Sequence, residues 1–267
     1  MDASPGFDIR GTANISGGEF GNSADFFVTS NTFISGGNFG NNVDLQGDAV
    51  IDGGTFGTNT DIGNFSDTST QNGNPDVTIN GGTFTELHVD SGVTDIFGGT
   101  FTGDTSPGAS NPAAGDAAIN AGATRDNQTL GTINIHGGDI QGFIEGFGNI
   151  NLFGTDFAID GTTIDGLSSF TVIDGESVLT GTLEDGNTIS LNLNRGFNFI
   201  NTDGTESQFT DRDEGDDFFG LFGETGINEG GILTAGGTTI VIGVPEPSSL
   251  SLLALGALGL ISRRRRS

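Results

Sequence analysis

The chain of 267 residues contains no cysteine, which excludes disulfides, thiolate zinc sites and a cysteine nucleophile. It also lacks tryptophan and tyrosine, so its 22 phenylalanines supply all of its aromatic side chains. A phenyl ring carries no polar group, and this favours packing inside the protein over display to a ligand. Proline occurs only 6 times against 48 glycines, without the three-residue period of collagen, so a collagen helix is excluded.

Positive charge is scarce as well. There is no lysine, and the 8 arginines face 35 acidic residues, which gives a formal net charge of -27. Four of these arginines form the run Arg263–Arg266 at the carboxyl terminus. A surface this negative repels nucleic acid, so we expect no nucleic-acid partner.

One short motif recurs along the sequence. The pattern Ile-x-Gly-Gly occurs six times, whereas the 23 isoleucines and 48 glycines would produce it by chance about 0.7 times. This motif therefore marks an internal repeat. Its anchor isoleucines are Ile15, Ile34, Ile51, Ile79, Ile96 and Ile135, and Leu152 lies another 17 residues on.

The repeat unit is about 17 residues long, and two longer intervals hold loop-like inserts. A degenerate copy, "INAGAT" at Ile119, divides the longest interval and predicts eight copies between Ile15 and Leu152. Glycine pairs would each cost a helix about 1 kcal/mol per residue relative to alanine, which argues against helical repeats. Apolar and polar residues alternate before each glycine pair, and this indicates strands with one buried face.

These features predict an all-β fold, a parallel β-solenoid of about eight short coils. In each coil a strand ends at a glycine corner, and a phenylalanine five residues after the anchor fills the interior. Stacked coils place isoleucine over isoleucine and phenylalanine over phenylalanine, which supplies a core that one coil cannot provide. A β-roll and a β-sandwich are the alternatives. We assign the solenoid to residues 1–157.

Residues 158–243 lack the Ile-x-Gly-Gly motif. They are predicted to form a β-rich cap over the last coil, with an acidic loop at Thr210–Gly220. The stretch Phe170–Asn194 alternates apolar and polar residues around Glu-Asp-Gly, which is typical of a hairpin. A cap is needed because an uncovered solenoid end exposes unpaired strand edges. Residues 244–267 form a separate carboxyl-terminal segment.

Three aspartates, Asp25, Asp44 and Asp61, each lie ten residues after an anchor isoleucine. In register they would form a column of carboxylates about 5 Å apart, repelling by about 0.8 kcal/mol per pair in water. Calcium, which prefers carboxylate and carbonyl oxygens, would relieve this repulsion. The alternative is three solvated turn residues. We therefore predict no cofactor, with Ca²⁺ at this column as the speculative exception.

The sequence argues against catalysis. His88 and His136 lie in different coils without the spacing of a zinc site, and no Gly-x-Ser-x-Gly motif is present. Pectin-acting β-helix enzymes pair acidic clusters with Arg or Lys, but Arg125 is the sole cation between Arg10 and Arg195. We predict that the protein is not an enzyme.

The carboxyl terminus reads "VPEPSSLSLLALGALGLISRRRRS". The apolar stretch Leu250–Ile261 is short for a membrane span, but residues 244–262 give a marginal one, with the arginines on the cytoplasmic side. We expect a single transmembrane helix here. Its apolar anchor residues are Leu250, Leu252, Leu253, Leu255, Leu258, Leu260 and Ile261, and its topology is set by Arg263, Arg264, Arg265 and Arg266.

This layout resembles the PEP-CTERM sorting signal, in which a Pro-Glu-Pro motif, an apolar helix and a basic cluster follow one another at the terminus. The resemblance implies that an exosortase-type membrane protease recognises Pro245, Glu246 and Pro247. It also implies an exported protein of a Gram-negative-type bacterium, inserted transiently in the inner membrane and then moved to the cell surface or extracellular matrix. The glycine-rich repeats are similar to those of planctomycete-type proteins with this signal.

The amino terminus, "MDASPGFDIRG", shows no secretory signal peptide, although the tail implies export. We expect either a misassigned start codon or a fragment. The resulting hypothesis is a non-catalytic structural protein of the surface or matrix, with exopolysaccharide or other matrix polymers as candidate partners. The alternatives are a carbohydrate-active or carbohydrate-binding β-helix and a calcium-dependent adhesin.

Overall fold

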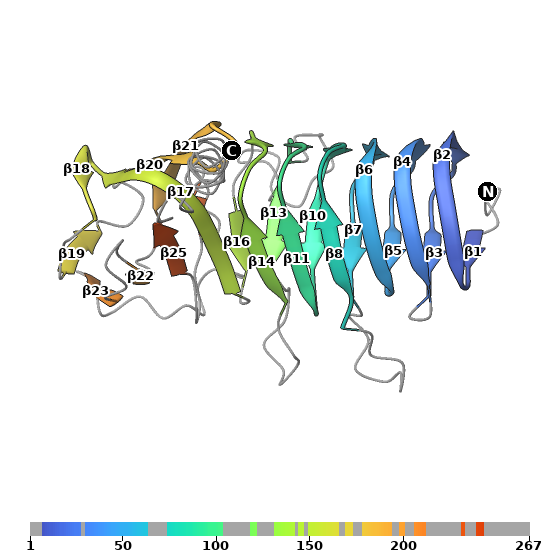
Figure 1. The fold of residues 1–267 in the computed structure, drawn as a ribbon, viewed down its shortest axis with the longest axis horizontal. Coiled ribbons are helices and arrows are strands. Elements are labelled where there is room, and N and C mark those ends of the chain that lie inside the picture. The colour runs from blue at the N-terminus through green and yellow to red at the C-terminus, as the bar shows by residue number, and fades with distance from the viewer. Residues whose placement is uncertain are drawn as a thin grey trace, which may run out of the picture.

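The computed structural model describes residues 7–27, 30–63, 74–103, 118–121, 131–141, 144–146, 149–165, 169–172, 178–193, 198–200, 206–211, 231–232 and 239–242. These residues form strands and turns, with no helix among them. The predicted all-β class is therefore confirmed. Strands of successive coils lie side by side along the long axis of the molecule, from the blue amino-terminal coil to the green coils near its middle (Figure 1).

Seven strands that carry the anchor residues form one continuous parallel row, here called the anchor row, in which each strand pairs with the next. Its members are β2 (Thr12–Phe20), β4 (Asn31–Phe39), β6 (Asp48–Phe56), β8 (Asp76–Ile79), β11 (Val93–Ile96), β14 (Thr132–Ile135) and β17 (Asn149–Ile159).

Seven shorter strands, each preceding an anchor strand in the chain, form a second parallel row, here called the short row. They are β1 (Phe7–Ile9), β3 (Ala24–Phe26), β5 (Val43–Leu45), β7 (Thr60–Ile62), β10 (Leu87–Val89), β13 (Ile119–Ala121) and β16 (Ile144–Gly146).

The phenylalanines that follow the glycine pairs lie in a third set of parallel pairings. In the first three coils these residues are the ends of β2, β4 and β6, and in later coils the same position lies on separate strands, where it is Phe84, Phe101 and then Ile140. The separate strands are β9 (Thr83–Phe84), β12 (Thr100–Phe101) and β15 (Asp139–Ile140). From β2 to β15, each coil thus returns its chain to the same three positions.

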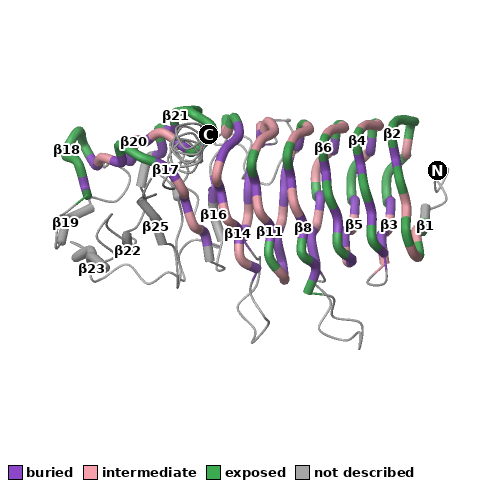
Figure 2. Tube along the Cα trace, viewed as in Figure 1, coloured by how far each residue is buried: buried purple, intermediate pink, exposed green. Residues whose placement is uncertain are grey.

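The interior repeats from coil to coil, as predicted. Ile34, Ile51, Ile79 and Ile96 are paired in register, and each is 0% exposed. The rings of Phe20, Phe39, Phe56, Phe84 and Phe101 stack in order, with centroids 4.6 to 5.2 Å apart. Figure 2 shows the resulting alternation of buried and exposed residues along the strands. The prediction of a single interior isoleucine row is confirmed.

The two glycines of each pair have different physical roles. The second adopts a backbone conformation that disfavours other residues, as at Gly54, where φ is 115°. The first lies against the preceding coil. A Cβ at Gly98 would come within 2.6 Å of the Asn80 carbonyl oxygen, so a side chain there would push neighbouring coils apart.

The prediction that Ile119 anchors an eighth copy is wrong. Ile135 pairs directly with Ile96, so the 39-residue interval is one coil with an insertion. Ile119 instead pairs with Leu87 and Ile144 in the short row. The reason is local: Ile119–Ala121 has the buried, half-buried, buried pattern of the three-residue short strands. The described residues therefore contain seven anchor strands.

After Ile159 the strands also pair in antiparallel fashion. β20 and β21 form the predicted hairpin around Glu-Asp-Gly. β20 and β25 pair with β17, while β24 pairs with β16, so this segment covers the last coil. The strands concerned are β18 (Thr162–Thr163), β19 (Ser169–Val172), β20 (Val178–Leu183), β21 (Thr188–Leu193), β22 (Asn198–Ile200), β23 (Glu206–Asp211), β24 (Gly231–Ile232) and β25 (Thr239–Ile242).

Candidate functional site

The short row carries a column of polar residues along its outer face. Each short strand has three residues, and in β3, β5, β7 and β10 the outer two are buried while the middle one is half-buried. The middle residues Asp25, Asp44 and Asp61 are paired in register, so the predicted alignment of these aspartates is confirmed. We call these three residues the acidic column.

The same register extends the column in both directions. Asp8 pairs with Asp25 on the amino-terminal side, and His88 pairs with Asp61 on the other. Asn120 and Glu145 continue the register beyond His88. The spacing of His88 in the sequence indicates no zinc site, and the structure places this residue directly against the acidic column.

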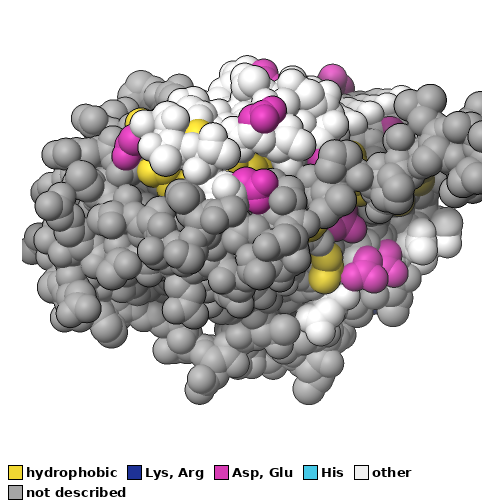
Figure 3. Space-filling view, turned by 60° about the vertical axis from the view of Figure 1, so that its left-hand side comes forward, with side chains coloured by type: hydrophobic (Ala, Val, Ile, Leu, Met, Phe, Trp, Pro, Cys, Tyr) yellow, Lys and Arg dark blue, Asp and Glu magenta, His cyan; other side chains and the backbone are white. Residues whose placement is uncertain are grey.

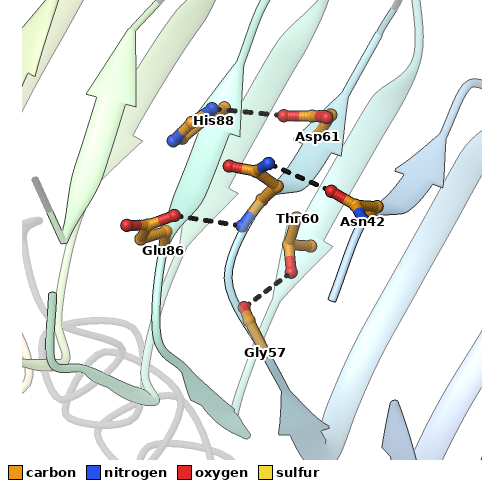
Figure 4. A network of polar contacts seen from close by, with 7 residues as sticks. Asn42, Gly57, Thr60, Asp61, Glu86 and His88 are labelled. Atoms are coloured by element: carbon orange, nitrogen blue, oxygen red, sulfur yellow. Dashed lines mark hydrogen bonds and ion pairs between the residues drawn. The ribbon is translucent and has the colours of Figure 1, made fainter. Parts of the chain in front are cut away.

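His88 contacts the acidic column through its ring. Its Nδ1 lies 3.2 Å from Asp61 Oδ1, and its side chain is 24% exposed (Figure 4). Burial acts to lower the pKa of His88, but the hydrogen bond and charge of Asp61, with the charges of Glu86 and Asp90, outweigh burial and raise this pKa above its usual value. The imidazolium form is thereby favoured, and it offsets part of the column's negative charge.

Asp44 lies between two other carboxyl groups. Burial, together with hydrogen bonding and charge from Asp25 and Asp61, raises the pKa of Asp44 from 3.8 to about 7. Two carboxyl groups can share a hydrogen bond only when one of them holds a proton. Among the three carboxyl groups of the acidic column, Asp44 is therefore the one whose protonated form the surroundings favour.

Asparagines form a second polar column beside the acidic one. Asn42 and Asn59 both have positive φ, and Asn59 Nδ2 donates to Asn42 Oδ1 over 3.0 Å. The buried Glu86 carboxylate accepts from the Asn59 backbone N–H at 3.1 Å (Figure 4). Sequence reasoning missed Glu86, whose carboxylate fixes the corner that leads into β7.

His136 belongs to a different cluster. Its ring stacks between Phe97 and Phe153, with centroids 4.7 and 4.1 Å away, and its Nδ1 lies 2.7 Å from Glu184 Oε2. Asp185, the next residue of the β20–β21 turn, accepts from the Gly138 backbone N–H at 2.7 Å. These contacts attach the hairpin to a glycine corner, so His136 has a structural role.

Metal ligation gains no support from these clusters. Among the residues that the structure describes, no group of three His, Cys, Asp or Glu side chains is arranged to hold a metal ion. Calcium at Asp25, Asp44 and Asp61 stays a prediction.

Acidic side chains are visible on the described surface in Figure 3. Of the predicted acidic loop, only Thr210 and Asp211 fall within the described part of the chain.

Comparison with known protein families identifies the carboxyl terminus. Residues 243–266 match the PEP-CTERM protein-sorting motif. The predicted motif is thus confirmed, and it implies an exported protein sorted and processed by an exosortase. No curated protein and no solved structure matches the chain.

The PEP-CTERM residues themselves lie outside the described part of the structure. This applies to Pro245, Glu246 and Pro247, to the predicted apolar helix and to the arginine run. Within the described residues, none of which is helical, there is no helix long and apolar enough to cross a membrane. The predicted transmembrane helix and the division into three domains therefore stay predictions.

Proposed function

We propose that this protein is a non-catalytic β-solenoid of the bacterial cell surface or extracellular matrix, delivered there through its PEP-CTERM motif. The match over residues 243–266 is the observation that carries the proposal. In this arrangement the apolar segment holds the chain in the inner membrane during export, and Arg263–Arg266 keep its end at the cytoplasmic side. Cleavage by the exosortase then frees the stacked coils.

The stack supports a structural role. Seven anchor strands at a spacing of about 4.8 Å give a column roughly 29 Å long from the first strand to the last. Its interior is made of repeated isoleucine and phenylalanine, and its carboxyl-terminal end is covered by β20, β24 and β25. A net charge of -27 favours solubility and repels other anionic polymers.

The experiment that tests delivery compares two variants of the tagged full chain in a bacterium that has an exosortase. Replacing Pro245, Glu246 and Pro247 by alanine removes the recognised motif. We expect the wild type at the cell surface or in the medium in a shortened form, and the variant uncleaved in the membrane fraction. Pro107→Ala, far from the motif, is the control and should behave as the wild type. Identical fractionation and size of the motif variant and the wild type would refute the proposal.

A second candidate, a carbohydrate-active β-helix, is favoured by the in-register acidic column, since paired carboxylates can act on glycosidic bonds. Incubating the full chain with a panel of acidic polysaccharides tests it. Chain cleavage that disappears when Asp25, Asp44 and Asp61 are changed to alanine would favour the enzyme. A matched triple variant of Asp48, Asp52 and Asp76, on the anchor row, should leave such cleavage unchanged.

A further inference from the structure

The outer face of the anchor row carries every large apolar side chain that is exposed in the described part of the chain. These side chains are Phe33 on β4, Val50 on β6, Val93 on β11 and Phe97, which directly follows β11. Buried and exposed residues alternate along the three strands, so these four side chains face outward together. The strands β4, β6, β8 and β11 lie side by side (Figure 1). Apolar surface gathered on one face marks an interaction site.

Phe97 is the most exposed of the four, at 47%. Its ring stacks on His136 with the planes 16° from parallel, and this contact covers one face of the ring. On the opposite side the preceding coil presents Asn80, because Ile96 pairs with Ile79 and the Phe97 N–H donates to the Ile79 carbonyl oxygen. Among the described residues no second ring stacks on Phe97. The free ring face therefore points along the stack, toward a shorter polar side chain.

Polar groups with a fixed orientation lie beside this ring. Asn80 donates one amide hydrogen to Asp52 Oδ1 over 2.8 Å, and it retains its Oδ1 and its second amide hydrogen. Asp95 lies on the same outer face, two residues before Phe97, and its Oδ1 accepts from Asn134 Nδ2 at 2.7 Å. Its Oδ2 accepts no hydrogen bond from the residues that the structure describes. An aromatic face, a carboxamide and a carboxylate are thus oriented before any ligand binds.

The chemistry of these groups selects a ligand class. The electron-rich face of an aromatic ring attracts C–H groups, a carboxylate only accepts hydrogen bonds, and a carboxamide both donates and accepts. A sugar ring satisfies all three, since it has C–H groups on its faces and hydroxyl groups around its rim. A protein partner fits poorly, because the core of its interface would bury Asp52 and Asp95 without a positive charge.

The charge of this face narrows the class further. Four aspartates point outward from the anchor row, whose described residues include no lysine or arginine: Asp48, Asp52, Asp76 and Asp95. Their field repels an anionic polymer. The strand spacing of about 4.8 Å is comparable to the length of one sugar in an extended chain. An uncharged polysaccharide along the stack would therefore meet one strand with each successive sugar.

We propose that the outer face of the anchor row binds an uncharged polysaccharide, with one sugar ring stacked on the free face of Phe97 and its hydroxyl groups bonded to Asn80 and Asp95. Val50 and Phe33 contact sugars further along the same polymer. The proposal rests on the proposed function, because an exported protein meets polysaccharide outside the cell. It gives the stack a defined partner and a face that is separate from the acidic column.

The test measures binding of the purified full chain in detergent by isothermal titration calorimetry. The probes are three soluble uncharged polysaccharides, namely hydroxyethyl cellulose, laminarin and galactomannan. Carboxymethyl cellulose has the cellulose backbone with added negative charge and is the control polymer. Chelator is present so that no metal bridges carboxylates. We expect binding to at least one uncharged polymer and none to carboxymethyl cellulose. No binding to any of the three, or equal binding to carboxymethyl cellulose, would overturn the proposal.

Variants of Phe97 then test stacking on the ring. Phe97→Leu keeps apolar bulk without a flat face and should bind at least about tenfold more weakly, whereas Phe97→Tyr keeps the ring and should bind as the wild type does. Asn80→Ala should also weaken binding by about tenfold, because it removes a hydrogen-bonding group. Thr162→Ala, on the exposed strand β18, is the control and should bind normally.

Melting temperatures of the same variants separate loss of binding from loss of folding. If Phe97→Leu does not fold, Asn80→Ala decides the outcome. Wild-type affinity in a folded Phe97→Leu or in Asn80→Ala, or equal weakening by Phe97→Tyr and Phe97→Leu, would contradict the proposed site. Phe97→Leu should still be cleaved and delivered to the surface, because its PEP-CTERM motif is intact. Failure of polysaccharide binding and failure of delivery are therefore distinct results.

Discussion

The rings of Phe56 and Phe84 stack with their centroids 4.6 Å apart and their planes 2° from parallel, although 28 residues separate them in the chain. The insert between them leaves the stack undisturbed, because each coil returns to the same register before its phenylalanine. Phe84 is 0% exposed and stacks on Phe101 on its other side, at 5.2 Å. Such a column ties the stability of each coil to its two neighbours.

Truncating this ring should therefore be costly. Phe84→Ala is expected to destabilise the protein by about 3–5 kcal/mol, because it removes buried apolar surface and leaves a cavity between two rings. Phe33→Ala is the matched control, since Phe33 is 39% exposed on the outer face of β4. Chemical denaturation of both variants measures the difference. Equal losses would show that the ring column does not carry the core.

The glycine corner gives a second prediction. Gly98→Ala would bring a methyl group within 2.6 Å of the Asn80 carbonyl oxygen, and the backbone must move to relieve that contact. We expect a loss of about 1–3 kcal/mol, measured by thermal and chemical unfolding.

Gly17 provides the control for this glycine. It occupies the corresponding position in the first coil, where a Cβ would meet no atom within 4 Å. Gly17→Ala should change stability by less than about 0.5 kcal/mol. Equal losses of stability in both variants would mean that the backbone at this corner position requires glycine, and that contact between coils is not the cause.

The sequence was sufficient to predict the anchor row because the Ile-x-Gly-Gly motif keeps a fixed order of strand, corner and ring. The sequence was misleading where the number of residues between an anchor and a later position varies. Asp25, Asp44 and Asp61 follow their anchors by ten residues, but His88 follows Ile79 by nine, so counting from the anchors does not assign His88 to the column. Asp8 precedes the first anchor, and counting from anchors could not reach it. Only strand pairing shows which side chains share a column.

The identity of Ile119 shows the same limit. Ile119 is followed by Asn, Ala and Gly, an order compatible with either an anchor or a short strand, and the neighbouring sequence is too divergent for spacing to decide. Pairing with Leu87 and Ile144 settles the row. The contacts of His136 with the β20–β21 turn were equally invisible, since Glu184 lies 48 residues away.

A buried hydroxyl group in the anchor row offers a stabilising substitution. Thr94 is 0% exposed, lies between Val77 and Ile133, and its Oγ1 has no hydrogen-bond partner among the described residues. Thr94→Val keeps the shape and removes the unpaired polar atom, so we expect a gain of about 1 kcal/mol and a melting temperature higher by roughly 2–4 °C.

The neighbouring Thr78 serves as the control for that gain. It lies in the middle of β8 and is half-buried on the outer side, so Thr78→Val should give no comparable increase. A lower melting temperature for Thr94→Val would indicate that its hydroxyl group is hydrogen-bonded in solution.

Removal of divalent metal tests the calcium hypothesis for Asp25, Asp44 and Asp61. The raised pKa of Asp44 favours its protonated form, and Asp61 lies against His88, so part of the negative charge of the column is already offset. We expect chelator to leave the melting temperature at pH 7 unchanged within about 1 °C. A clear drop that is restored by calcium, and that is absent after Asp44→Asn, would instead support a calcium-dependent adhesin.

The contact between His88 and Asp61 predicts a pH effect of its own. Because the pKa of His88 is raised above 6.5 in the folded chain, its protonation stabilises the native state fully below pH 6.5, and this contribution is lost as the pH rises through the raised value. Asp61→Asn removes the charged acceptor and should lower the pKa of His88. The chain has only 2 histidines, so an NMR titration of their ring protons, with His136→Gln to assign them, measures this shift directly.

Asp76→Asn should leave the His88 titration unchanged, because Asp76 lies on the anchor row. An unaltered His88 titration in Asp61→Asn would mean that this 3.2 Å contact does not persist in solution.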